Sequence, residues 1–270
     1  MSKRVAQLAA IIRLEVRKAF LSKRSIPIYI LALLPVLVFA GRALLAPQAE
    51  DADRLGHSVT LYGVVFQSFI LRTCIFFGCV GIFTNLFRGE ILDRSLHFYF
   101  LAPVRRETLV FGKYIAGLLA AIVLFSGTTA ATLLLNYVPH GRALALEHLL
   151  RGPGLGHLVA YLGVTALACL GYGAVFLAIG LFFRNPVVPA VLILGWESII
   201  FLLPPLLKKI SVIYYLQSLC PFQIPQGPVA ILAEPSPLWL AVPGIIGVTV
   251  VLLVIAARRA RRLEIMYGAE

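Results

Sequence analysis

Charged side chains are scarce in this sequence: Asp, Glu, Lys and Arg make up 13% of its 270 residues, while 60% are hydrophobic. A soluble domain of this size could not cover so much apolar surface, so the composition excludes an ordinary soluble protein. Cysteine is also scarce, with four residues and no close C-x-x-C pair, which indicates neither a disulfide framework nor a zinc site. The phosphate-binding motif G-x-x-x-x-G-K-S/T and the metalloprotease motif H-E-x-x-H are both missing from the sequence.

Long apolar runs make up most of the sequence. Each of six runs reaches the roughly 20 residues that a helix needs to cross a ~30 Å hydrocarbon core. We therefore predict an all-α polytopic membrane protein in which residues 1–270 form a single transmembrane domain. The second and third spans are long enough to tilt or to project past the bilayer. The predicted spans are 26–46, 59–87, 109–137, 157–183, 187–207 and 238–257.

Basic residues gather at the ends of these runs and predict the orientation. Seventeen Lys and Arg residues fall on one side of the spans and five on the other. The positive-inside rule places the larger group, and with it both termini, in the cytoplasm. This arrangement accounts for the net charge of +12 without a nucleic-acid partner.

Two segments outside the spans have patterns of their own. Residues 1–25 place apolar side chains on one helical face and basic ones on the other, which predicts an interfacial helix on the cytoplasmic leaflet. A basic flank that only fixes topology is the alternative. The proline-rich outer segment 208–237 predicts short broken helices that re-enter the outer leaflet, although an ordinary exposed loop fits it equally well.

A charged segment, residues 88–108, lies between the second and third spans, and no lipid-buried helix could hold it. As a helix it would place Leu92, Leu96, Tyr99 and Phe100 on one face. Pro103 disfavours helical geometry at the preceding residue, so this helix should end there. A short amphipathic helix held between two membrane spans is suited to pass force to a soluble partner.

This segment resembles the cytoplasmic coupling helix of ABC-2 type transporter permeases. The usual pattern of that helix is an acidic residue, a small polar residue with leucine, a proline, basic residues and a closing Gly-Lys. The rest of the chain fits the same family, although residues 97–100 are more aromatic than in a typical member. The matching residues here are Glu90, Ser95, Leu96, Pro103, Arg105, Arg106, Gly112 and Lys113.

The resemblance implies a permease subunit of an ATP-driven exporter in a prokaryotic cytoplasmic (inner) membrane. Two copies of a separate ATP-binding subunit would hold ATP and Mg, so this chain would need no cofactor and would not itself be an enzyme. A second permease copy would complete the transporter, either as a homodimer or as a heterodimer. The residues expected to contact the ATP-binding subunit are Glu90, Leu92, Arg94, Leu96, Tyr99, Phe100, Pro103, Arg105 and Arg106.

Two ionisable residues fall near the middle of predicted spans: Arg72 in the second and Glu197 in the fifth. A charge at that depth costs at least ~2.5–3.5 kcal/mol, so it should be paired or face water. Their matching depth predicts an Arg72–Glu197 ion pair, within one subunit or across a dimer. Such a pair could serve packing alone, or it could belong to a substrate path or gate.

Other functions fit the sequence less well. An intramembrane serine protease would need a histidine at the depth of its serine, yet only His157, at the edge of the fourth span, comes near one. A membrane scaffold without transport would leave the charged segment 88–108 unexplained. Three outer histidines match no standard zinc spacing, so we expect no metal site there: His140, His148 and His157.

Overall fold

The computed structural model of the chain describes residues 3–46, 52–92, 105–183, 185–199, 211–222 and 237–261. These residues are almost entirely helical, and none of them forms a strand, which confirms the all-α prediction for the described chain. The helices are α1 (Lys3–Leu21), η1 (Lys23–Ser25), α2 (Ile26–Leu45), α3 (Ala52–Val65), η2 (Phe66–Ile75), α4 (Phe76–Leu92), α6 (Arg106–Tyr137), η3 (Val138–His140), α7 (Arg142–Leu150), α8 (Gly154–Phe182), α9 (Val187–Ser198), α11 (Val212–Ser218) and α12 (Leu238–Arg261).

Five helical stretches are long and apolar enough to cross a membrane, so the chain is a multi-pass membrane protein. The predicted count of six spans is not confirmed. For the fifth predicted span the structure describes α9, which has 12 residues and is too short to cross alone. Residues 200–210 lie outside the described chain. The five stretches are Lys23–Leu45, Asp53–Glu90, Arg106–His140, Gly154–Phe182 and Leu238–Arg261.

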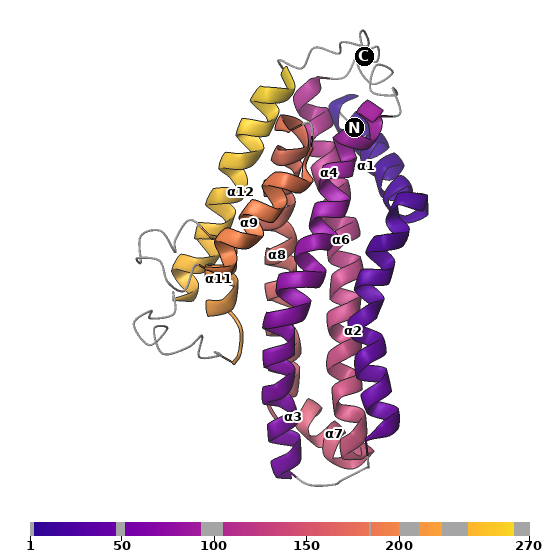
Figure 1. Cartoon of the computed structure of the whole chain (residues 1–270), viewed down its shortest axis with the longest axis vertical. Coiled ribbons are helices and arrows are strands. Elements are labelled where there is room, and N and C mark those ends of the chain that lie inside the picture. The colour runs from indigo at the N-terminus through magenta and orange to yellow at the C-terminus, as the bar shows by residue number, and fades with distance from the viewer. Residues whose placement is uncertain are drawn as a thin grey trace.

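The helices form an elongated bundle, and α1 begins at the same end of it at which α12 ends (Figure 1). We call this the terminal end and the opposite one the far end. Arg259 of α12 lies 5.4 Å from the ring of Phe182, so α8 also finishes at the terminal end. Because α8 and α12 both finish there, the chain must run back between them, and α9 begins that return (Figure 1).

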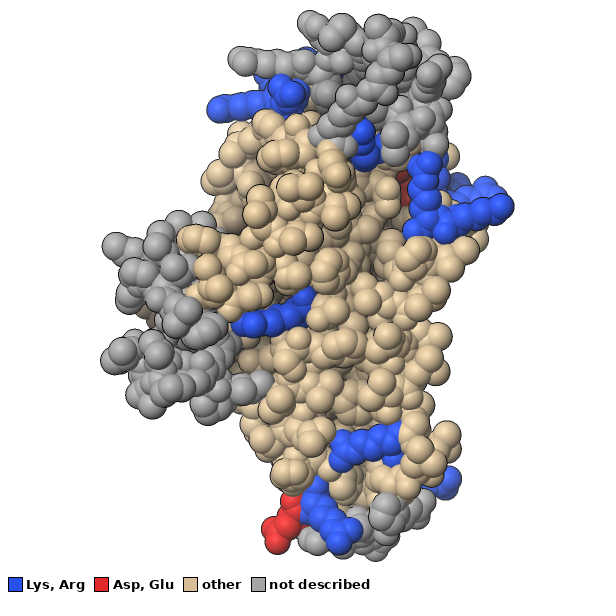
Figure 2. Space-filling model, viewed as in Figure 1, with Lys and Arg blue, Asp and Glu red and all other residues tan. Residues whose placement is uncertain are grey.

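Small residues allow the helices to pack closely around α8, the most buried of the five stretches. A Cβ atom added to Gly173 of α8 would come within 2.5 Å of the Phe83 ring on α4. Gly78 of α4 likewise leaves room for Phe125 of α6. Close packing over glycines is how membrane helices associate where no hydrophobic force drives them together. On the face drawn in Figure 2, basic side chains lie toward both ends, and the broad, mostly uncharged belt between them is interrupted by a basic side chain near its middle.

The second membrane stretch, Asp53–Glu90, has 38 residues and a rise of ~57 Å, so it must tilt or extend beyond a bilayer, as predicted. Its middle, Phe66–Ile75, is a π-helix (η2) flanked by α3 and α4. π-Helices are rare and often mark functional sites. This one contains Arg72, one of the two ionisable residues singled out in the sequence.

The N-terminal segment and part of the outer segment are helical in the described structure. α1 is a helix that packs along α6, and its buried side includes Ile11 and Glu15. In the outer segment, α11 is short and packs against α8 and α12. Whether α1 lies on a lipid surface and whether α11 re-enters the bilayer remain predictions.

Candidate functional site

A fully buried lysine lies near the start of α6. The ammonium of Lys113 is 2.8 Å from a carboxylate oxygen of Glu15 on α1 and 2.8 Å from one of Glu90 on α4. It also donates to the backbone oxygen of Leu86 at 3.0 Å. These three acceptors match the three donors of an ammonium group. They compensate the removal of its charge from water, which would otherwise be very unfavourable.

Lys18 completes the group. Its ammonium lies 3.1 Å from Glu90 and 3.7 Å from Glu15, and its side chain is 48% exposed. Two carboxylates and two ammonium groups therefore balance one another in what we call the four-charge cluster: Glu15, Lys18, Glu90 and Lys113. The cluster joins α1, α4 and α6 at the terminal end of the bundle.

The glycine before Lys113 lets α1 approach α6. A Cβ atom on Gly112 would lie 2.8 Å from a methyl carbon of Ile11 and 3.3 Å from Leu8, both on α1. Any larger residue would push the two helices apart and draw Glu15 away from Lys113. The Gly-Lys pair of the sequence pattern thus has a structural reason: glycine admits the helix, and lysine binds its carboxylate.

Sequence reasoning found part of this cluster. It placed Glu90, Gly112 and Lys113 in one sequence pattern, and the structure brings Glu90 and Lys113 into contact. It missed Glu15. The available signal was an acidic residue on an otherwise basic N-terminal helix, three positions before Lys18.

The other predicted contact residues are only partly described. Leu92 lies in the last turn of α4, and Arg105 is exposed just before α6. Arg106 donates to the backbone oxygen of Arg261 at 2.9 Å, so it caps the end of α12. The remaining predicted residues lie outside the described chain: Arg94, Leu96, Tyr99, Phe100 and Pro103.

A cleft of about 450 Å³ opens beside the cluster, between α1, α2 and α4. Its lining is mixed, with Ser22, Arg24 and Asn85 among the polar residues and Ile28 and Ile82 among the apolar ones. Lys113 is therefore fully buried, whereas the other three members of the four-charge cluster line this cleft: Glu15, Lys18 and Glu90.

A second polar group lies within the apolar belt, around Glu197. The side chain of Glu197 is 6% exposed. Its carboxylate accepts hydrogen bonds from the hydroxyl of Tyr172 at 2.7 Å, the hydroxyl of Ser211 at 3.2 Å and the amide of Ile213 at 3.3 Å. These bonds join α9 to α8 and to the start of α11.

Arg72 lies near this group without touching Glu197. Its charge interacts with the carboxylate electrostatically, but the two side chains form no ion pair in the described structure. The Nε atom of Arg72 is buried and has no hydrogen-bond partner among the described residues. Instead of the direct ion pair expected from depth alone, the carboxylate of Glu197 is stabilised by Tyr172, Ser211 and Ile213, which the sequence did not mark.

A third polar group lies at the far end and was not predicted. Arg42 donates to Asn136 at 2.9 Å and to Ser58 at 2.8 Å, and the Ser58 hydroxyl also lies 2.9 Å from Nε2 of His140. These bonds tie α2, α3 and α6 together. Among the described residues, no three His, Cys, Asp or Glu side chains are grouped as metal ligands would be.

Comparison with known proteins agrees with the resemblance seen in the sequence. A family model described as ABC-2 family transporter protein matches residues 11–196, which is more than half of the chain. The matched region includes the whole four-charge cluster and Arg72. No curated protein matches the chain.

Proposed function

The chain belongs to the ABC-2 transporter family, and we propose that it is the permease subunit of an ATP-driven exporter powered by a separate ATP-binding subunit. The observation that carries this proposal is the four-charge cluster, which stands where the charged segment 88–108 joins the membrane helices. Glu90 lies in the last turn of α4, where that segment begins, and Lys113 lies near the start of α6, just after the segment ends. The sequence lacks its own phosphate-binding motif, so ATP and Mg would be held by the partner.

Segment 88–108 would seat on the ATP-binding subunit and receive its motion. The Lys113–Glu90 contact makes the ends of α4 and α6 respond together, and the Lys113–Glu15 contact adds α1. A buried ion pair is costly to break, because either partner alone would be left as an uncompensated charge. Motion at the segment would therefore displace three helices as one unit.

α4 would carry this motion into the apolar belt. It continues directly from the π-helix that holds Arg72, and Arg72 interacts with Glu197. An arginine with an unused buried donor can bind a polar or anionic group that passes it. Arg72 and Glu197 would thus line the substrate path or act as its gate, with packing alone as the alternative.

A complete transporter would need a second permease copy. Half-transporters of this size form one side of a pathway, so we propose a dimer of permeases with two ATP-binding subunits. A homodimer is the simplest form, and a heterodimer with a related permease is the competing one. Both termini would face the cytoplasm of a prokaryotic cell, in agreement with the basic residues at the span ends.

The test of this function is ATP hydrolysis by the purified complex with its ATP-binding subunit, with and without substitutions in segment 88–108. We expect Leu96→Asp or Tyr99→Asp to insert normally but to lose stimulated hydrolysis and transport, because a charge would enter an apolar contact. The control is His97→Gln, a mild change in the same segment. Leu119→Asp, on the exposed part of α6, would not serve as a control because its charge would face lipid. Wild-type transport by either Asp variant would contradict the assignment.

The same experiment separates the alternatives. A membrane scaffold would bind the ATP-binding subunit or another partner without stimulating hydrolysis. An intramembrane enzyme would act on its substrate without ATP. Either result would exclude the permease function proposed here.

A further inference from the structure

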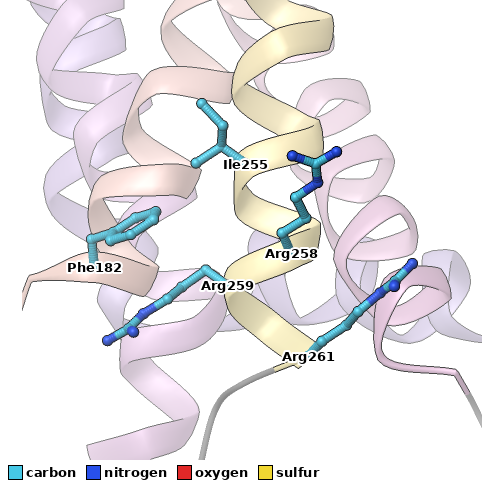
Figure 3. Close-up of a pocket in the computed structure, with 5 residues that line it drawn as sticks. All are labelled: Phe182, Ile255, Arg258, Arg259 and Arg261. Atoms are coloured by element: carbon cyan, nitrogen blue, oxygen red, sulfur yellow. The ribbon is translucent and has the colours of Figure 1, made fainter.

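The end of α12 carries arginines that the proposed coupling does not use. Arg258, Arg259 and Arg261 line a hollow of about 610 Å³ together with Phe182 of α8 and Ile255 of α12. Figure 3 shows Arg259 leaning toward Phe182, while Arg258 and Arg261 project from other sides of the helix end. The Arg259 guanidinium lies 5.4 Å from the centre of the Phe182 ring, which is a cation–π contact.

Among the described residues, two of these three arginines have no acidic partner. Arg261 pairs with Glu107 at the start of α6. Neither Arg258 nor Arg259 forms an ion pair with a carboxylate in the described parts of the chain. Guanidinium groups without an acidic partner indicate a site for an anion. A neighbouring hollow of about 410 Å³ extends the basic surface and is lined by Arg105, Arg106, Glu107 and Arg261.

The side chains next to this hollow belong to an exposed apolar face. Phe182 is 44% exposed and Ile255 is 41% exposed, and Val251, one turn earlier on α12, is 57% exposed. In a membrane protein such a face lies against lipid. The hollow therefore lies where the apolar face ends and arginines begin, at the level expected for lipid headgroups.

We propose that this hollow binds an anionic phospholipid, with its phosphate among the arginines and its acyl chains along Val251 and Ile255. Guanidinium groups match phosphate oxygens well, and basic pockets at the ends of membrane helices bind anionic headgroups. The bound lipid would compensate Arg258 and Arg259. It would also lie beside the start of α6, where Arg106 and Glu107 already hold the end of α12.

The test measures which lipid the full chain retains after purification from nanodiscs of phosphatidylcholine containing a minor share of phosphatidylglycerol. Native mass spectrometry should show retained phosphatidylglycerol on the wild-type chain. Arg258→Gln/Arg259→Gln should lower this preference by about 30-fold, because two basic groups near the headgroup are lost. Both side chains are exposed, so folding should be unaffected.

The matched control is Arg13→Gln/Arg17→Gln, which removes two exposed arginines from α1 and should keep the wild-type preference. Arg258→Lys/Arg259→Lys, which keeps the charge but loses the planar guanidinium groups, should lose only part of it.

Three results would overturn the proposal. Equal losses in the Gln variant and the control would mean general attraction to negative lipid without a site. Occupation by soluble glycerol phosphate without retained phosphatidylglycerol would mean that phosphate alone is recognised. A Gln variant that keeps phosphatidylglycerol but no longer associates with the ATP-binding subunit would assign the arginines to that protein.

Discussion

The four-charge cluster and the Arg72–Glu197 region both place charged side chains out of water, but they compensate them differently. Around Lys113, each of three donors has an acceptor, and positive and negative charges are equal in number. Around Arg72, the arginine and the carboxylate interact only at a distance, and a buried donor of the arginine has no partner among the described residues. All three donors of Lys113 therefore have acceptors within the protein, whereas Arg72 has a buried donor that is unused among the described residues.

This difference indicates that the two sites have different roles. A buried ion cluster holds its helices in one arrangement, since opening it would leave buried charges unpaired. An arginine with unused capacity, on a π-helix within the apolar belt, can exchange water, substrate and protein partners at lower cost. We therefore propose that the cluster transmits force and that Arg72 contacts the substrate.

The largest effect is expected from Lys113→Met, which keeps the volume of the side chain but removes its charge. Glu15 and Glu90 would then share Lys18 alone. The free energy of unfolding should fall by about 3–5 kcal/mol, the usual consequence of breaking a buried ion pair. Titration with a denaturing detergent measures it.

The matched control is Lys18→Met, the same substitution on the exposed member of the cluster. Because Lys18 is 48% exposed, its loss should lower the free energy of unfolding by less than about 1 kcal/mol. Equal effects of the two substitutions would show that burial does not distinguish them and that Lys113 is not the centre of the cluster.

A smaller effect is expected from Gly112→Val, which places carbon atoms where Ile11 now lies. The free energy of unfolding should fall by about 1–3 kcal/mol through overpacking. Gly127→Ala on the same helix has open space around it and should be neutral or stabilise by up to about 1 kcal/mol. Thermal unfolding of the two variants compares them, and a neutral Gly112→Val would mean that α1 does not need its close approach to α6.

The smallest energy is expected for the interaction between Arg72 and Glu197, measured in a double-mutant cycle of Arg72→Ala and Glu197→Ala. Glu197→Ala alone should cost about 1–3 kcal/mol, because buried groups of Tyr172 and Ser211 lose their acceptor. Since the two charges do not touch, the interaction energy of the cycle should be at the low end of the ~0.5–3 kcal/mol seen for contacting residues.

Transport measured on the same variants distinguishes a role in the substrate path from a role in packing alone. Arg72→Ala should remain folded and lose transport, because its charge serves the substrate more than the fold. A folded Arg72→Ala that transports normally would leave packing as the role of both residues.

Hydropathy predicted most of the fold, and local pattern predicted part of the site. The five long membrane stretches follow from apolar length alone. The π-helix could not be predicted, because a shift of backbone hydrogen bonds leaves the hydropathy of Phe66–Ile75 unchanged. The fifth predicted span is not confirmed, since α9 ends at Ser198 and residues 200–210 lie outside the described chain.

Sequence analysis predicted the site residues that belong to one local pattern. It missed the residues that only tertiary contact brings to the site. Glu90 and Lys113 belong to one sequence pattern, whereas Glu15 is 98 residues from Lys113 along the chain. Equal depth favoured Arg72 as the partner of Glu197. The depth of a residue in the membrane does not say toward which side of its helix the side chain points. Glu197 instead accepts hydrogen bonds from Tyr172 and Ser211.

The most direct test of the central claim is the distance between α1 and α6 in the assembled transporter, before and after ATP binds to the partner subunit. Spin labels at Arg13→Cys and Leu119→Cys, both exposed, report this distance by electron paramagnetic resonance. We expect one narrow distribution that is unchanged by ATP in the wild type and broadened in Lys113→Met. A distance that shifts on ATP binding while the four-charge cluster is intact would show that α1 moves independently of α6 and would contradict the account.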